Sequence, residues 1–307
     1  MSYLFILDQV SSLNIKKDTS IQLIKEFIRQ KKEIYCCEIN DLSIGADSKG
    51  MALCGLVNNI STQINLNEKK SILTSNFKKV FVRKDPPFNQ AYLNLTFILD
   101  HIKTEGVEVI NDGASLRNHN EKLSILQFKD IISPTIVSSS EEVLKTFIKK
   151  HKKVILKPVD GMAGNGIFMV TSNDQNMNVI LETMTLHNHQ LIMAQKFIPD
   201  IQYGDKRIIL IDGEPLPYVL ARIPQNNEIR ANLAKGGKGV IRKLSEDDIA
   251  IVATIKPYLR KNNFRFVGID VIGKYLTEIN VTSPTGLVEI QAQAKINFSK
   301  SIVDALS

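Results

Sequence analysis

Residues 266–285 read FVGIDVIGKYLTEINVTSPT, and this stretch does most to decide the expected fold. Two runs rich in β-branched residues flank the Gly273-Lys274 turn, which predicts a pair of antiparallel strands. The pair carries three side chains with hard oxygen ligands, Asp270, Glu278 and Asn280. Carboxylate and amide oxygens of this kind bind Mg²⁺ beside a nucleotide, so we predict a metal site on one face of the strand pair.

Whether the three ligands share a face depends on the strand register. Glu278 and Asn280 are two residues apart and point the same way, whereas Asp270 joins them only if it pairs with Glu278. A two-residue loop would pair Ile272 with Tyr275 and turn Asp270 away. A three-residue connection or a bulge would restore the match, and we expect the three-residue connection. The alternative is a solvated hairpin with chance carboxylates.

The composition indicates an ordinary globular protein. The chain has 307 residues, of which 43% are hydrophobic and 23% charged, which is enough for two or three packed units. The formal net charge of +7 favours anionic partners: nucleic acid, phosphorylated cofactors or acidic peptides. Because there is no basic tail, zinc-finger spacing or RNA-binding signature, we expect no nucleic-acid partner.

Cysteine content and hydropathy indicate the compartment. The cysteines are Cys36, Cys37 and Cys54, an odd number without a CxxC motif, which is typical of reduced thiols in a cytosolic protein. Residues 2–7 are apolar but lack a basic n-region, so they predict a first strand instead of a signal peptide. No run approaches the ~20 apolar residues that span a bilayer. We therefore expect a cytoplasmic protein with no membrane partner.

The order of predicted elements indicates an α/β first part. Strands at 3–7 and 33–38 enclose a helix at 18–30, and a strand at 79–83, a helix at 90–105 and a strand at 107–110 follow. We expect an open parallel sheet, although residues 41–76 have too weak a periodicity to place. The pattern changes near Asn120 to helices and then strand pairs. We therefore divide the chain into domains 1–121 and 122–307, the latter made of subdomains 122–199 and 200–307.

A glycine-rich segment follows in the second domain. Residues 154–168 read VILKPVDGMAGNGIF, in which a strand delivers Lys157 and the glycines Gly161, Gly164 and Gly166 form a loop before a second strand. Backbone N–H groups of such a loop can surround a polyphosphate while the lysine neutralises it. The order of residues matches neither a P-loop nor GxGxxG, so we expect a flap over phosphates. A glycine hairpin with a surface lysine is the alternative.

Two further segments could complete a nucleotide site. Residues 191–199, LIMAQKFIP, form an apolar strand that ends at a proline, where main-chain groups could bind an adenine edge; a core strand is an equally good interpretation. A loop rich in Asn, Gly and Lys runs from 223 to 239, bordered by Arg222 and containing Arg230, and its length indicates a lid. The arginines suit a carboxylate or phosphate, though each alone is more often a surface charge.

The chain has no recognisable protein nucleophile. It contains no GxSxG motif, and the close pair His187 and His189 lacks the spacing of a zinc site. Lysines, arginines, glycine loops and Mg²⁺ ligands without a nucleophile fit phosphoryl transfer by positioning and electrostatics.

Taken together, the motifs resemble those of one family. The runs are Asn14-Ile15-Lys16-Lys17-Asp18, Arg83-Lys84-Asp85-Pro86-Pro87-Phe88, Asn120-Glu121-Lys122-Leu123, Leu156-Lys157-Pro158, Gly204-Asp205-Lys206-Arg207, Leu220-Ala221-Arg222-Ile223-Pro224-Gln225 and Thr277-Glu278-Ile279-Asn280-Val281-Thr282-Ser283-Pro284-Thr285. They closely resemble bacterial glutathione synthetase over nearly the whole chain, except about 42–76 and the part after Ile290. The resemblance implies an α/β (α+β) protein with an ATP-grasp fold preceded by an N-terminal open α/β parallel-sheet domain. It also implies that glycine is joined to γ-glutamylcysteine through an acyl phosphate while ATP is cleaved to ADP and phosphate.

The resemblance further implies roles for individual residues. Phosphates and nucleotide would contact Lys122, Lys157, Gly161, Gly164, Gly166 and Asp205, with the adenine hinge at Gln195, Lys196, Phe197 and Ile198. Mg²⁺ or Mn²⁺ would be bound by Asp270, Glu278 and Asn280. The reacting carboxyl would be surrounded by Arg207, Arg222, Arg230 and Asn232, and the substrates would also contact Lys16, Arg83, Ser283 and Thr285. The expected partners are ATP, γ-glutamylcysteine, glycine and further copies of the chain, in a homotetramer.

Two positions depart from the family pattern. Ala163 and Ala231 stand where the family has glycine, which would stiffen both loops. Two other functions stay open: a different carboxylate–amine ligase, adding glutamate or joining two D-alanines, and a nucleotide-binding or nucleic-acid-binding protein without catalysis.

Overall fold

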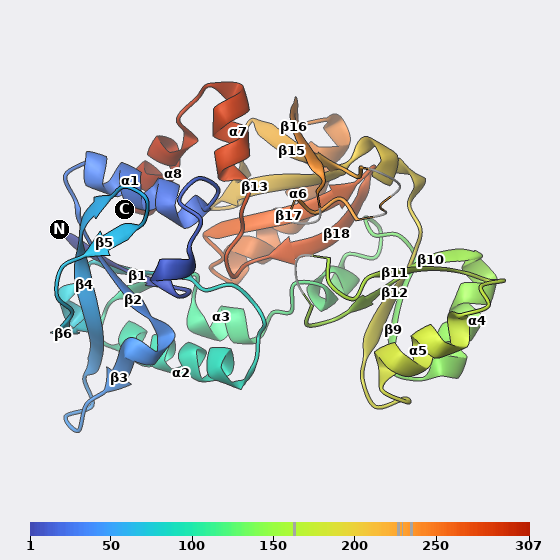
Figure 1. Cartoon of the computed structure of the whole chain (residues 1–307), viewed down its shortest axis with the longest axis horizontal. Helices are drawn as coiled ribbons and strands as arrows, with labels where there is room; N and C mark the ends of the chain where they lie inside the picture. Colours follow the sequence, from blue (N-terminus) through green and yellow to red (C-terminus); the bar gives the residue numbers. More distant parts are fainter. Residues whose placement is uncertain (162–163, 226–227, 229, 234–235) are drawn as a thin grey trace.

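The computed structural model describes residues 1–161, 164–225, 228, 230–233 and 236–307. Within these ranges the strands form three sheets. Figure 1 shows the first sheet at the left, the third in the upper centre and the second at the right. The same ranges contain the short 3₁₀ helices η1 (Val10–Ser12), η2 (Ile39–Asp41), η3 (Thr74–Asn76) and η5 (Pro199–Tyr203), and a further one, η4 (Leu123–Gln127), is described below.

The first sheet has a parallel centre. Its strands are β1 (Ser2–Leu7), β2 (Glu33–Glu38), β3 (Leu42–Ile44), β4 (Gly50–Ile60), β5 (Ile64–Leu66), β6 (Lys70–Leu73), β7 (Lys79–Arg83) and β8 (Glu108–Ile110). Strands β2, β1, β7 and β8 are adjacent and parallel, which confirms the expected open α/β arrangement. The segment that the sequence left unplaced supplies β3 to β6, which extend the sheet in antiparallel fashion from β2 and from β4.

Helices cover both faces of this sheet. Helix α1 (Thr19–Arg29) begins after Asp18, whose side chain accepts hydrogen bonds from the N–H groups of Ser20 and Ile21, as expected for a cap. Residues Tyr3, Phe5 and Leu7 belong to the core cluster that contains α1. Leu4 and Ile6 belong to the cluster that contains α2 (Gln90–Thr104). Since both faces of β1 are covered, the strand is a continuous apolar run.

The second sheet is small and antiparallel. It consists of β9 (Thr135–Ser138), β10 (Lys153–Pro158), β11 (Phe168–Thr171) and β12 (Ile192–Lys196), in the order β11-β10-β12-β9. Helices α4 (Glu141–His151) and α5 (Met177–Thr185) pack on it through a separate apolar cluster. The linker that reaches it from the first sheet contains α3 (Gly113–Arg117) and η4 (Leu123–Gln127).

The third sheet carries most of the predicted site. Its strands are β13 (Asp205–Ile211), β14 (Glu214–Pro215), β15 (Tyr218–Ile223), β16 (Lys238–Lys243), β17 (Phe266–Ile272) and β18 (Tyr275–Asn280), and all their pairings are antiparallel. One face is buried by α6 (Glu246–Lys261) in the same cluster as Ile208 and Leu210. Part of the opposite face, with Ile209 and Leu220, packs in the cluster that contains α7 (Leu287–Ala294) and α8 (Phe298–Leu306).

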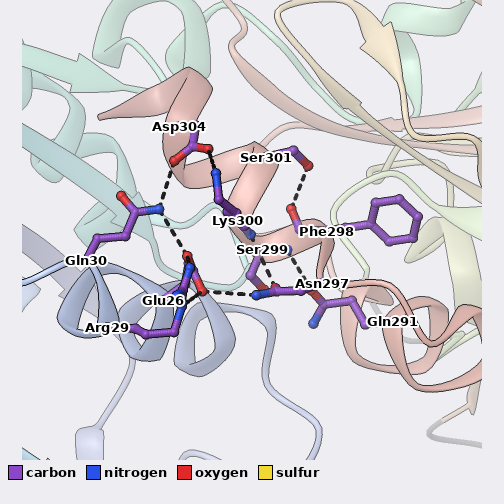
Figure 2. Close-up of polar contacts among 10 residues, drawn as sticks. All are labelled: Glu26, Arg29, Gln30, Gln291, Asn297, Phe298, Ser299, Lys300, Ser301 and Asp304. Carbon is purple, nitrogen blue, oxygen red and sulfur yellow. Dashed lines mark hydrogen bonds and ion pairs between the residues drawn. The ribbon is translucent and has the colours of Figure 1, made fainter.

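A polar seam joins α1 to α8, as Figure 2 shows. Gln30 Nε2 donates to Asp304 Oδ1 at 2.8 Å, and Asn297 Nδ2 donates to Glu26 Oε2 at 3.1 Å. The hydrogen bonds that Arg29 donates to the Glu26 carboxylate lower its pKa to about 2, with smaller contributions from Gln30 and Asn297. The first and third sheets are therefore held together by a buried carboxylate as well as by apolar contacts.

Asn111 forms a second connection between these sheets. Its Nδ2 donates to the carbonyls of Phe266 and Val281 at 2.8 and 2.7 Å, and its Oδ1 accepts from the N–H groups of Arg265 and Phe266. The linker between the sheets is thus fastened to the ends of β17 and β18. In the part of the chain that the structure describes, no helix is long and apolar enough to cross a membrane.

Candidate active site

A β-bulge places Asp270 opposite Glu278. Ile272 pairs with Tyr275 across the two-residue turn Gly273-Lys274, so the expected three-residue connection is wrong. The register shifts between Asp270 and Val271, after which Asp270 pairs with Glu278. The bulge residue is Thr277, whose Oγ1 donates to the Asp270 carbonyl at 3.1 Å. The expected same-face arrangement of Asp270 and Glu278 is confirmed, and the bulge that we considered second is its cause.

Two arginines from neighbouring strands surround Asp270. Arg207 on β13 pairs with Asp270, and its Nε and Nη2 donate to the two carboxylate oxygens at 2.6 and 3.1 Å. Arg222 on β15 pairs with Asp205, and its Nη2 lies 2.6 Å from Asp205 Oδ2 and 3.0 Å from Asp270 Oδ2. Strand alternation therefore brings two cations and two anions from three strands onto one face of the sheet.

The charges of this cluster are strongly coupled. Burial alone would raise the pKa of Asp270, but the guanidinium groups of Arg207 and Arg222 hold it below its ordinary value. Burial raises the pKa of Asp205 to about 6, with Arg222 opposing the shift and Asp270 and Glu278 adding to it. Asp270 is thus firmly ionised, whereas burial disfavours the ionised form of Asp205.

The donor set at this face suits a hard divalent cation. Glu278 stands opposite Asp270, and Asn280 is two residues further on the same strand face. Among the described residues, Asp205 Oδ1 and Asn280 Nδ2 are buried without hydrogen-bond partners, so the face has polar atoms left for a ligand. No group of three or more His, Cys, Asp and Glu side chains that could hold a metal occurs in the described ranges, and a site here would use an amide as its third ligand.

A pocket with about 910 Å³ of empty space, part of it open solvent, lies between the second and third sheets, and we call it cavity A. It has apolar walls and a few charged groups. The predicted residues that line it are Lys122, Lys157, Gly161, Gly164, Gln195, Lys196, Phe197, Ile198, Asp205, Arg230, Asn232, Asp270 and Glu278. Apolar walls with a few polar groups are typical of a cofactor pocket.

The glycine loop between β10 and β11 closes one side of cavity A. Gly164 has a φ of +75°, and a side chain there would come within 2.5 Å of Asn232 Oδ1. Lys122 Nζ donates to the Gly161 carbonyl, which ties the linker to this loop. Gly166 does not line cavity A, although we predicted that it binds nucleotide; its φ is +67° and it packs close to Pro158. Ala163, a predicted departure from the family, lies outside the described residues.

The predicted adenine hinge is partly occupied by the protein itself. Lys196 N–H donates to the Pro134 carbonyl at 2.8 Å, and Phe197 N–H donates to the Lys153 carbonyl at 3.0 Å. Gln195 Nε2 donates to Thr135 Oγ1 at 3.1 Å. These contacts fix the end of β12 at the wall of cavity A.

A second pocket, cavity B, adjoins the first and has about 880 Å³ of empty space, part of it open solvent. Predicted residues that line cavity B alone are Arg207, Arg222, Asn280, Ser283 and Thr285. Residues that line both cavities are Lys122, Gly161, Asn232, Asp270 and Glu278. The two cavities therefore meet at a lysine, the predicted metal ligands and the loop residue Asn232.

Two predicted substrate residues do not line cavity B. Lys16 is exposed and borders neither cavity. Arg83 is buried; its Nε donates to Ser20 Oγ at 3.0 Å, its Nη2 donates to the Pro284 carbonyl at 2.8 Å, and its guanidinium lies 4.8 Å from the centre of the Phe266 ring. Arg83 therefore supports the segment that contains Ser283 and Thr285 without lining cavity B.

The predicted lid between β15 and β16 is described only in part. Residues 226–227, 229 and 234–235 lie outside the described ranges. Arg230 Nη1 donates to the Gly164 carbonyl at 3.4 Å, so the loop contacts the glycine loop across cavity A. Ala231, the other departure from the family, is buried.

Several residues that line or support the cavities were given no role by sequence reasoning, among them Asp85, Glu121 and His119. Asp85 and Glu121 line cavity B. His119 is buried, with Nε2 3.0 Å from the Ile279 carbonyl and Nδ1 2.7 Å from Tyr258 Oη. Because a carbonyl only accepts, Nε2 carries the proton and Nδ1 accepts from the tyrosine. Burial lowers the pKa of His119 to about 4, so it is neutral and fixes β18 between Glu278 and Asn280.

Comparisons with known proteins cover nearly the whole chain. Residues 1–117 match the family model described as prokaryotic glutathione synthetase, N-terminal domain, and residues 121–295 match its ATP-grasp domain. Glutathione synthetase of Vibrio cholerae is 44% identical over 306 residues, covering 98% of this chain and 95% of the relative. Glutathione synthetase of Coxiella burnetii is 42% identical over 300 residues, covering 97% of this chain and 94% of the relative.

Solved structures show the same fold at low sequence identity. A RiPP-associated ATP-grasp ligase of Chryseobacterium gregarium, in complex with ADP and a leader and core peptide, aligns with a TM-score of 0.68 at 18% identity, covering 99% of this chain and 96% of its own. The D-cycloserine synthetase DcsG aligns with a TM-score of 0.68 at 12% identity over 100% of both chains. The expected ATP-grasp fold is thereby confirmed.

Proposed function

This chain belongs to the prokaryotic glutathione synthetase family, and on that premise we propose how its two cavities divide the reaction. The protein is a ligase that uses ATP to join glycine to γ-glutamylcysteine, giving glutathione, ADP and phosphate. In our proposal cavity A binds ATP and cavity B binds the dipeptide and glycine. The γ-phosphate and the dipeptide carboxylate meet where the cavities join.

The observation that carries this proposal is the set of residues common to both cavities. Lys122, Asp270 and Glu278 border cavity A and cavity B. Transfer of a phosphoryl group to a carboxylate brings several negative charges together, and catalysis then depends on cationic groups fixed at that point. A lysine and a cation-binding carboxylate pair at the junction fit this requirement.

On the nucleotide side, Lys122 and Lys157 neutralise the phosphates, and the glycine loop at Gly161 and Gly164 covers them. Both lysines are buried, which strengthens their interaction with a bound anion. The end of β12, from Gln195 to Ile198, binds the adenine, and Asp205 faces the nucleotide. Gly166 shapes the loop without touching the ligand.

Asp270, Glu278 and Asn280 would hold Mg²⁺ or Mn²⁺. A bound cation would neutralise the charge that develops on the transferring phosphoryl group. The unpartnered Asp205 Oδ1 at the same face supports this assignment, since a buried carboxylate oxygen is seldom left without a donor or a cation.

On the acyl side, Arg207 and Arg222 orient the dipeptide carboxylate, and Arg230 and Asn232 approach it from the loop. The carboxylate oxygen attacks the γ-phosphorus, the bond from this phosphorus to the oxygen of ADP breaks, and the products are an acyl phosphate and ADP. The ammonium group of glycine loses a proton to water, its nitrogen attacks the acyl carbon, and cationic donors stabilise the oxyanion of the tetrahedral intermediate before the bond from this carbon to the phosphate oxygen breaks and phosphate leaves. No protein nucleophile is needed. Ser283 and Thr285 contact the substrates, Arg83 positions their segment through Pro284, and Lys16 stays an expectation from the family resemblance alone.

A coupled measurement of products tests the function. Purified protein is incubated with ATP, γ-glutamylcysteine, glycine and Mg²⁺, and ADP and tripeptide are quantified together, with each substrate omitted in turn. We expect one ADP per glutathione and background turnover without the dipeptide. Equal or greater turnover with glutamate or D-alanine as the amine, or background turnover combined with tight salt-sensitive binding of DNA or RNA, would replace the proposal by one of the two alternatives.

The remaining expectations concern organisation. We propose domains at 1–121 and 122–307, with subdomains 122–199 and 200–307, supported by the three separate sheets. We also propose a cytoplasmic location, supported by three cysteines that are all free thiols. The homotetramer rests on the family resemblance, and light scattering after size exclusion would test it.

A further inference from the structure

Cavity B contains an anchored carboxylate that has no assigned role. Glu121 Oε1 accepts three hydrogen bonds: from Val281 N–H at 2.9 Å, from Thr282 N–H at 3.2 Å and from Thr282 Oγ1 at 2.9 Å. The Ile279 N–H also donates to the Glu121 carbonyl at 2.9 Å. This oxygen and the backbone of residue 121 are therefore fixed to the segment that follows β18.

The second oxygen of this carboxylate is available to a ligand. Oε2 accepts no hydrogen bond from the described residues, and it is not among the side-chain atoms sealed from solvent without a partner. Glu121 lines cavity B. A carboxylate with one oxygen held by three donors and the other open to a cavity is a preorganised acceptor for a cation.

The other carboxylates that line cavity B have contacts or positions of their own. Asp270 is bonded to two arginines, and Glu278 borders both cavities opposite it. Asp85 follows β7 and interacts with Ser283, and like Glu121 it lines cavity B but not cavity A. Glu121 directly precedes Lys122, which lines both cavities. Of the two carboxylates left, Glu121 is thus tied to the junction where the acyl phosphate forms.

Cavity B presents charges of both signs. Its cations Lys122, Arg207 and Arg222 favour the carboxylates of the substrates, whereas an ammonium group is favoured only beside a carboxylate that is not already paired with these cations, as Asp270 is. Both amino substrates carry an ammonium group at neutral pH. Glycine must bring its nitrogen to the acyl carbon, at the junction, despite these cations.

We propose that Glu121 Oε2 accepts a hydrogen bond from the ammonium group of glycine and thereby holds the glycine nitrogen beside the junction of the two cavities. The inference rests on the proposed function of cavity B. It assigns Glu121 to binding of the amino substrate, with no part in binding ATP or in forming the acyl phosphate.

The substitution Glu121→Gln isolates this contact. The three donors around Oε1 keep the amide oxygen of glutamine in that position, so the amide NH₂ takes the place of Oε2 and faces the ammonium group as a donor. Since a hydrogen bond to a charged group contributes about 1.5–3 kcal/mol, the KM for glycine should rise by about 10- to 100-fold. The KM values for ATP and γ-glutamylcysteine should stay within about twofold of wild type, because their binding energy lies in other contacts.

Two further measurements separate binding from support of the fold. Hydroxylamine, which reacts as a neutral amine, should trap the acyl phosphate as a hydroxamate at nearly the wild-type rate in the Glu121→Gln variant. Thr282→Val removes one of the three donors to Oε1 and keeps the carboxylate, so it should lower the melting temperature while the KM for glycine rises much less than in Glu121→Gln, although Thr282 also lines cavity B.

The outcomes distinguish this inference from the proposed function. Loss of hydroxamate formation in Glu121→Gln, an unchanged KM for glycine, or an equal rise of that KM in Thr282→Val would each overturn the role of Glu121, provided that the wild-type protein makes glutathione. Absence of glutathione formation by the wild-type protein would instead overturn the proposed function.

Discussion

Replacing Asp270 by Asn should destabilise the protein strongly, even without ligands. The Asp270 side chain is 5% exposed and lies between Arg207 and Arg222, with nitrogen–oxygen distances of 2.6 and 3.0 Å. Asparagine keeps the shape of the side chain but removes its charge. Two buried guanidinium groups would then be balanced only by Glu278, which is not hydrogen-bonded to them, and by Asp205, whose own ionisation burial disfavours.

The expected loss follows from breaking a buried ion pair. Removing one partner of such a pair costs about 3–5 kcal/mol, because the remaining charge stays buried without compensation. At about 2 °C per kcal/mol for a chain of this size, the melting temperature should fall by about 6–10 °C. The effect should be present in EDTA and without ATP, which separates it from any role of Asp270 in holding a metal.

Calorimetric melting of the ligand-free protein measures this loss. Asp47→Asn is the matched control, because Asp47 forms an exposed pair with Lys49 and its loss should leave the melting temperature close to wild type. A melting temperature of Asp270→Asn within about 2 °C of wild type would refute the reasoning, as would an equal fall in the control.

Three other outcomes are expected. Glu278→Gln should lower turnover by at least about 100-fold while leaving the circular dichroism spectrum unchanged, and near-normal turnover at ordinary Mg²⁺ concentration would contradict its assignment. Arg230→Ala should keep the affinity for ATP but release more than one ADP per tripeptide, since water would reach the acyl phosphate; a ratio of one with wild-type kcat would exclude Arg230 from the chemistry. His119 has a folded pKa of about 4 against an ordinary 6.5, so the unfolded chain binds the extra proton and the free energy of unfolding should fall by about 3 kcal/mol as the pH drops from above 6.5 to 4. Urea titrations over the same pH range should show a smaller fall in the free energy of unfolding for His119→Gln than for the wild-type protein. Identical pH dependence in both proteins would show that His119 does not titrate as described.

Much of the site could be predicted because its residues lie on regular strands. Alternation along a strand predicts that Glu278 and Asn280 share a face, and the motifs around Lys157, Arg207 and Arg222 could be read from local sequence. The predicted three-residue connection was wrong because a bulge leaves no periodic signal in the sequence. Thr277 continues the strand pattern, and only the pairing of Asp270 with Glu278 shows that Thr277 is an extra residue in β18.

The residues that sequence reasoning missed act through distant contacts. Glu121 bonds to residues 160 and 161 positions away, and His119 accepts from a tyrosine 139 positions away. Glu121 stands in the motif Asn120-Glu121-Lys122-Leu123, but the motif by itself gives it no role, and His119 has no local pattern that would distinguish it from a polar linker residue. Strands β3, β5 and β6 were not placed because each is short and only partly buried. Strand β4 was not placed because its buried residues are interrupted by glycine and polar residues, so its hydrophobic alternation is weak.

The seam between α1 and α8 has a consequence for biosynthesis. Gln30 and Asp304, which join the two helices, are 274 positions apart. At roughly 5–20 residues per second, α1 leaves the ribosome about 15–50 s before its partner exists. During that time the apolar side chains that α1 shares with Phe298, Ile302 and Val303 have nothing from α8 to cover them. The nascent N-terminal part is therefore a natural client for a chaperone until translation reaches the end of α8.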